Sequence, residues 1–71
     1  MQPHELRVVE EKRQLDVLLD GLAAFIDGSQ FKALPADERR RLYAQHRVMV
    51  TYSIILRERI EAFPPITPEK P

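Results

Sequence analysis

The sequence predicts an all-α protein: an antiparallel two-helix hairpin that assembles into a helical homo-oligomer. Two long segments carry apolar residues at helical spacing, and glycine and proline separate these segments and end the second one. Residues 49–56 also have apolar side chains pointing all round a helix, whereas one partner helix covers a single stripe. We therefore expect a hairpin domain over residues 1–63 and a flexible proline-rich tail over residues 64–71.

The first helix is expected over about residues 3–27, with Pro3 suited to its first turn. Gly21 costs such a helix about 1 kcal/mol relative to Ala, so it marks either a close helix contact or a tolerated glycine. Gly28 and the serine after it are typical of a helix end. The apolar residues that recur at spacings of three, four and seven are Val8, Leu15, Leu18, Leu22, Phe25 and Ile26.

A short loop anchored by Phe31 and Leu34 should lead to Pro35, which starts a second helix that runs to about Phe63. Both helices would be roughly 35–45 Å long, so an antiparallel hairpin is the economical arrangement. The residues expected on the stripe that faces the first helix are Leu42, Met49, Tyr52, Leu56, Ile60 and Phe63. Other apolar side chains lie to one side (Val48, Ile55) or towards the back (Val50, Ile54).

The composition indicates a single small domain that needs help to be stable. At 71 residues, and with no cysteine for disulfides, its core is expected to supply no more than roughly 3–5 kcal/mol, which favours oligomerisation. Eleven basic and eleven acidic residues cancel, which argues against a polynucleotide partner. No run approaches about 18 apolar residues and no signal-peptide pattern is present, so we expect a soluble, unexported protein with no membrane partner.

Residues that could carry catalysis are sparse. His46 has no acidic residue four positions away that could complete a helical metal pair, and His4 is far off in the sequence. Ser29 and Ser53 lack the strained glycine-flanked turn of a nucleophile. We therefore predict that the protein is not an enzyme and that it uses no metal or cofactor.

The back face of the second helix is the strongest candidate site. An aromatic ring, a guanidinium, a hydroxyl and two aliphatic groups lie there within about 100° of one another, and such a set could stack a base, hold a phosphate and exclude water. The same residues could instead form a mixed subunit contact. They are Tyr43, Arg47, Val50, Thr51 and Ile54. The run Arg39-Arg40-Arg41 is expected to be a solvated helix face with local ion pairs.

Four blocks of the chain, over roughly residues 5–63, resemble a family of small phage proteins: the cyclic-oligonucleotide sponges that block the bacterial defence system CBASS. The hairpin domain of this family is shared with sponges that block Thoeris defence and that carry additional sequence. The blocks are Arg7-Val8-x-x-Glu11-Lys12-x-x-Leu15, Leu22-x-x-Phe25-Ile26, Phe31-x-x-Leu34-Pro35 and Tyr52-x-x-x-Leu56-x-x-Arg59-Ile60.

The resemblance implies a homohexamer that binds cyclic dinucleotides, such as cyclic GMP-AMP-like messengers, in pockets between subunits. Some members also bind cyclic trinucleotides at separate sites. The ligand is held without cleavage, which implies action in the cytoplasm of the infected bacterial host. The alternative is a helical-hairpin interaction or inhibitor module that binds another protein, and binding of cyclic nucleotides would distinguish the two.

Family members differ in their N-terminal segments, so the resemblance assigns no pocket residues. From the chemistry of phosphates and bases we predict that Arg47, Thr51 and Tyr43 contact the ligand, with Arg7 and Lys32 as contributors. Arg7 and Lys32 belong near opposite ends of the hairpin, so they could meet only between antiparallel subunits or serve separate sites.

Overall fold

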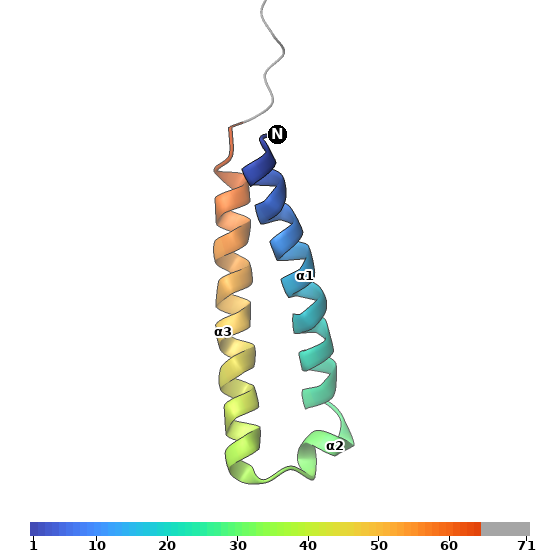
Figure 1. Ribbon diagram of the computed structural model, residues 1–71. Coiled ribbons are helices and arrows are strands. Elements are labelled where there is room, and N and C mark those ends of the chain that lie inside the picture. Colours follow the sequence, from blue (N-terminus) through green and yellow to red (C-terminus); the bar gives the residue numbers. More distant parts are fainter. Residues whose placement is uncertain (65–71) are drawn as a thin grey trace, which may run out of the picture.

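A computed structural model describes residues 1–64, and over these residues the protein is entirely helical and turn. Helix α1 spans Pro3–Ile26, α2 spans Ser29–Lys32 and α3 spans Ala36–Glu61. Helices α1 and α3 run antiparallel, with α2 in the turn between them and the N-terminus beside the end of α3 (Figure 1). The predicted hairpin is confirmed, whereas the prediction for tail residues 65–71 lies outside the described part of the chain.

The start of α1 is fixed by its own first turn. The backbone N–H of Gln2 donates to the carboxylate of Glu5 at 2.7 Å, and Pro3 is the first helical residue. This arrangement satisfies a backbone donor that a helix start leaves without a partner, and it puts a negative charge near the positive end of the helix dipole.

The turn differs from the predicted short loop, because residues 29–32 form the short helix α2, which buries Phe31. Gly28 precedes α2 with φ −89°, so it does not end α1 through a left-handed conformation. A Cβ at Gly28 would lie 3.3 Å from the carbonyl oxygen of Phe25, so close packing explains this glycine. Periodicity could not predict α2, since a single helical turn contains too few residues to show a repeat.

The second helix begins and ends close to its predicted limits. Pro35 directly precedes α3, and its carbonyl accepts the N–H of Arg39 at 3.0 Å. The helix ends at Glu61 rather than Phe63, whose N–H donates to the carbonyl of Ile60 at 3.1 Å in a closing turn. Pro64 then follows, and a proline cannot donate a further helical hydrogen bond.

The core lies at the end of the hairpin away from α2. Val8 and Leu15 of α1 are buried against Leu56 of α3, which is 0% exposed. Met49, Ile60 and Phe63 pack against this cluster, as the predicted stripe required. Three residues that were predicted to lie on the apolar stripes are instead exposed: Leu18 by 65%, Tyr52 by 40% and Phe25 by 36%.

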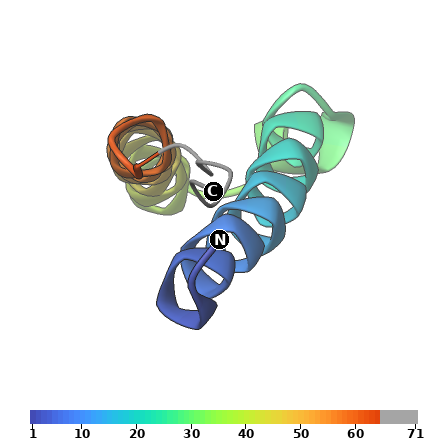
Figure 2. The ribbon, with the colours of Figure 1, turned by 90° about the horizontal axis from the view of Figure 1, so that it is seen from above.

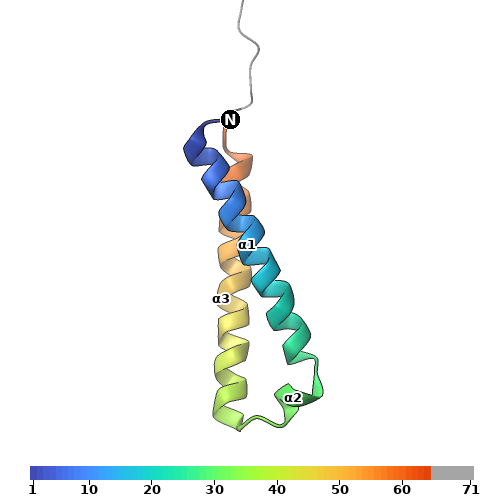
Figure 3. The same cartoon turned by 45° about the vertical axis from the view of Figure 1, so that its right-hand side comes forward.

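The position of α1 against α3 explains the exposure of Leu18. The views in Figures 2 and 3 show that α1 crosses α3 obliquely and that the two helices diverge towards α2. Leu18 is rotated about 60° from Leu15 on the helix wheel. That rotation is away from Lys12 and Asp16, which face α3, so Leu18 points to the outside.

A polar link joins the two long helices at mid-length. Ser53 of α3 donates to the carboxylate of Asp16 at 2.6 Å, and Lys12 donates to the same carboxylate at 2.6 Å and to the Ser53 hydroxyl at 3.2 Å. The hydrogen bonds from Lys12 and then from Ser53 hold the pKa of Asp16 below its ordinary value. Because polar partners at fixed positions specify register, this link places residue 16 opposite residue 53.

Near the turn, aromatic side chains fill the space between the diverging helices. The ring of Phe31 lies 5.1 Å from that of Tyr43 and 6.3 Å from that of Phe25, both edge to face.

Within residues 1–64, no helix is both long enough and apolar enough to cross a lipid bilayer.

Candidate functional site

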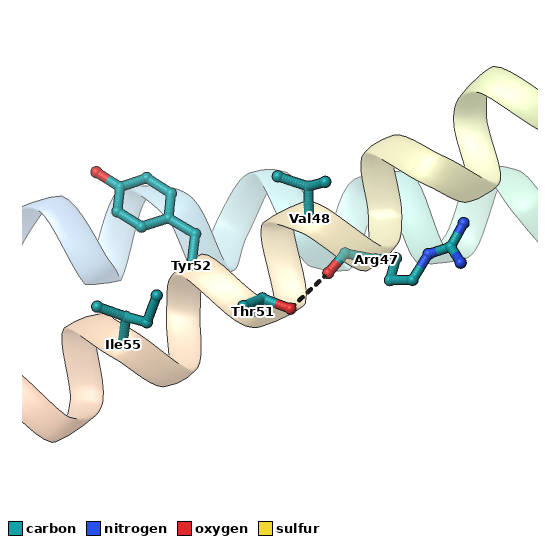
Figure 4. Close-up of a pocket in the computed structure, with 5 residues that line it drawn as sticks. All are labelled: Arg47, Val48, Thr51, Tyr52 and Ile55. Atoms are coloured by element: carbon teal, nitrogen blue, oxygen red, sulfur yellow. Dashed lines mark hydrogen bonds between the residues drawn. The ribbon is translucent and has the colours of Figure 1, made fainter.

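A surface hollow of about 420 Å³ lies on α3, on the side turned away from α1 (Figure 4). We call it the α3 hollow. Helical spacing brings its residues together, because positions three and four apart lie on one face of a helix. The residues that line it are Arg47, Val48, Thr51, Tyr52 and Ile55.

Two of the predicted ligand residues, Arg47 and Thr51, therefore share this hollow. Within residues 1–64, Arg47 forms no ion pair, so its guanidinium remains available to an anion. The hydroxyl of Thr51 donates to the backbone carbonyl of Arg47 at 3.1 Å (Figure 4). In this rotamer Thr51 can accept a hydrogen bond but has no proton left to donate, so among the lining residues Arg47 carries the cationic donor of the hollow.

The remaining lining residues were not among the predicted ligand contacts. Val48 and Ile55 are 67% and 47% exposed, and with the ring of Tyr52 they form a largely apolar wall. From the helical spacing alone, Tyr52 is expected on the stripe that faces α1, with Val48 and Ile55 to one side of it. Val48, Tyr52 and Ile55 are four and three residues apart, and this spacing could have predicted a second apolar stripe on α3.

The other three predicted residues lie outside the hollow. Tyr43 packs its ring against Phe31 near the turn, although it remains exposed on one side. Arg7 is exposed in the first part of α1, and Lys32 is exposed in α2, at the opposite end of the hairpin (Figure 1). Within one protomer the structure therefore brings neither of these two cations to Arg47.

A second hollow, of about 320 Å³, lies on α1 and is lined by Arg13, Gln14, Val17 and Leu18. We call it the α1 hollow. Arg13 donates two hydrogen bonds to the carboxylate of Glu10, at 2.6 and 2.9 Å, and Gln14 donates a third at 3.2 Å. The bonds from Arg13, followed by the bond from Gln14, lower the pKa of Glu10 to about 2. This carboxylate therefore carries its charge at any physiological pH.

The arginine run at the start of α3 behaves largely as the solvated face that was expected. Arg40 pairs with Asp37 at 3.8 Å and Arg41 with Glu38 at 2.8 Å, on the same helix. The third member, Arg39, instead has a buried Nε that finds no hydrogen-bond partner among residues 1–64. Among residues 1–64 there is no group of three His, Asp or Glu side chains that could hold a metal ion.

These features define a small helical-hairpin protein that keeps little of its apolar surface inside and presents an arginine-flanked apolar hollow on its outer face. The chain belongs to the Sequestin family, whose model matches residues 2–62. Searches of curated proteins and of solved structures give no match. The family name points to sequestration of a ligand, and the match covers nearly the whole hairpin.

Proposed function

We propose that this protein is a phage anti-defence protein that sequesters the cyclic di- and trinucleotide messengers of CBASS immunity without cleaving them. It would act in the cytoplasm of the infected bacterium. The observation that carries this proposal is the α3 hollow, in which a guanidinium borders an apolar and aromatic surface. Membership of the Sequestin family supports the sequestering part of the proposal.

The hollow has the chemistry that a cyclic dinucleotide requires. Each messenger of this kind presents phosphates, which need cations, and bases, which need flat or apolar surfaces. Arg47 can fork onto a phosphate or stack on a base, and the ring of Tyr52 offers a stacking surface at the other end of the hollow (Figure 4). Val48 and Ile55 would keep water from the bases.

The size of the hollow supports a site shared between subunits. Its volume of about 420 Å³ falls within the range of small-molecule sites, about 300–1,000 Å³, but such sites usually bury about 70–90% of the ligand surface. A hollow on one exposed helix face covers a ligand on one side only. A second subunit would provide the opposite wall, which agrees with the homohexamer that the family resemblance implies.

The required affinity is within reach of such a site. A sponge that works at nanomolar concentration needs about −12 kcal/mol. A cyclic dinucleotide of roughly 45 heavy atoms reaches this value at about −0.3 kcal/mol per atom. Sequestration needs no chemical step, and the α3 hollow contains no carboxylate or imidazole that could serve as an acid or a base.

A thermal-shift screen of the purified protein against a panel of cyclic di- and trinucleotides tests the proposal. We expect at least one messenger to raise the melting temperature, and mass spectrometry should recover it intact after the protein is denatured. Recovery of linear nucleotide would reveal an enzyme instead. Absence of any shift across the panel would favour the interaction module, since a protein-binding hairpin has no reason to respond to nucleotides.

A further inference from the structure

The outer face of α1 carries a stripe that the hairpin itself does not cover. Its members follow one another at spacings of four, three and four, so they lie within about 60° of one another on the helix wheel. They are Glu10, Gln14, Val17 and Gly21, which we call the α1 stripe. Two of these residues, Gln14 and Val17, line the α1 hollow.

Gly21 has no explanation within the hairpin. A Cβ added there would meet nothing within 4 Å, and the residue has no positive φ. Glycine in the middle of a helix is unfavourable, so an exposed glycine in open space is a cost without a local benefit. Close approach of another helix to this face would account for it.

The flank of α3 carries a stripe with the same spacing. Val48, Tyr52, Ile55 and Arg59, which we call the α3 stripe, follow one another at four, three and four. Three of them line the α3 hollow. Within residues 1–64, Arg59 forms no ion pair, whereas Glu10 on the α1 stripe is an ionised carboxylate that already accepts two hydrogen bonds from Arg13. A carboxylate can accept further hydrogen bonds, so Arg59 of another copy could share it.

We propose that the α1 stripe of one copy packs antiparallel against the α3 stripe of a second copy of this chain. In that orientation Glu10 faces Arg59 and Val17 faces Tyr52. Gly21 then faces Val48 and leaves room for it. A parallel orientation would instead set Glu10 against Val48 and Arg59 against Gly21, so charge complementarity selects the antiparallel one.

Taken together with the proposed function, this contact would bring a second cation, Arg13 of the second copy, to the edge of the α3 hollow that Arg47 and Thr51 line. Arg13 is rotated by about 70° from the middle of the α1 stripe and Arg47 by about 110° from the middle of the α3 stripe, in the same sense. Antiparallel packing therefore puts both arginines on the same edge of the contact. At about 1.5 Å per residue, the two arginines stand about 13 Å apart along the helix axis. Arg13 binds Glu10 through Nε and Nη2, so its Nη1 is the group that would reach a phosphate. Arg47 of the other subunit would reach the second phosphate of a cyclic dinucleotide.

Cysteine cross-linking tests the contact, because the chain has no cysteine of its own. Two differently tagged copies, one carrying Val17→Cys and the other Tyr52→Cys, are co-expressed and oxidised without ligand. We expect a disulfide-linked heterodimer. The control pair combines Val17→Cys with Arg57→Cys, an exposed position on another face of α3, and should yield at least tenfold less product.

Gly21→Leu provides a second measurement that unfolding cannot mimic, since open space and better helix propensity favour the hairpin. Light scattering should show loss of the oligomer with unchanged helical circular dichroism. The control Asp20→Leu, on the neighbouring exposed residue about 100° away, should keep the oligomer.

A monomeric wild-type protein, no Val17–Tyr52 cross-link, or an unchanged mass for Gly21→Leu would each overturn the inference. If the cross-link forms but no cyclic nucleotide binds, the contact stands and the proposed function fails. If a nucleotide binds to an oligomer that does not cross-link, the function stands and this contact is wrong.

Discussion

Arg47→Ala should weaken binding of a cyclic dinucleotide by about 10- to 150-fold and leave the hairpin intact. The lost interaction is a hydrogen bond between charged groups, which contributes about 1.5–3 kcal/mol, and about 1.4 kcal/mol corresponds to a tenfold change in affinity. Arg47 is exposed and has no ion pair among the described residues, so its removal leaves no buried charge behind. Isothermal titration calorimetry measures the affinity, and circular dichroism and light scattering check the fold and the assembly.

Arg57→Ala is the matched control for this substitution. Arg57 is an exposed arginine of the same helix outside the α3 hollow, and its ion pair with Glu61, at 4.0 Å, is long and solvated. This variant should bind within about twofold of the wild type, because Arg57 does not line the hollow. Loss of its surface ion pair should also leave the fold nearly unchanged. Equal binding by Arg47→Ala and the wild type would show that the α3 hollow is not the ligand site. Dissociation of the Arg47→Ala oligomer would instead assign Arg47 to a subunit contact.

Four further results are expected. Tyr52→Ala should weaken ligand binding by about 1–3 kcal/mol through loss of a stacking surface, whereas Tyr52→Phe should restore most of it in the same titration. Thr51→Val should change the affinity less than threefold, because the hydroxyl proton is already donated to a backbone carbonyl. Leu56→Ala should lower the free energy of unfolding by about 2–5 kcal/mol, measured by urea denaturation at fixed protein concentration, since its side chain is fully buried. The lowered pKa of Asp16 means that its ionised form stabilises the fold above about pH 5 and that this contribution is lost as the pH falls below about 4. The stability difference between wild type and Asp16→Asn should therefore shrink between pH 7 and pH 3.

The long helices and their buried stripe could be predicted because they depend on local rules. Met49, Leu56 and Ile60 repeat at helical spacing, and proline and glycine fix where the helices begin and end. Leu18 fits the same spacing yet is exposed, because its exposure depends on the angle at which α1 crosses α3. That angle is a property of the packed pair, so no periodicity in one helix contains it.

Part of the candidate site could be predicted from the sequence: its cation and hydroxyl could, whereas its apolar residues could not. Helical geometry alone places Arg47 and Thr51 together, and the structure adds Val48, Tyr52 and Ile55 to them. Tyr43 illustrates the limit of a helix wheel. It shares the back face of α3 in projection, but α2 brings Phe31 to its ring, and a helix that short leaves no periodic signal in the sequence.

The exposed apolar surface and the small core have one physical origin. Two helices that pack as a pair bury one stripe each. Here α1 and α3 each carry a further stripe, the α1 stripe and the α3 stripe, and the members of both follow one another at spacings of four, three and four. Apolar side chains at half exposure or more, as at Val48 and Leu18, favour association in water, since covering them removes apolar area from solvent. The α3 stripe also lies beside Arg47 of the α3 hollow. The surface that would hold subunits together therefore shares side chains with the surface that would hold a ligand, namely Val48, Tyr52 and Ile55. A ligand at such a boundary would stabilise the assembly as well as occupy it, and ligand affinity and oligomer stability would then rise and fall together.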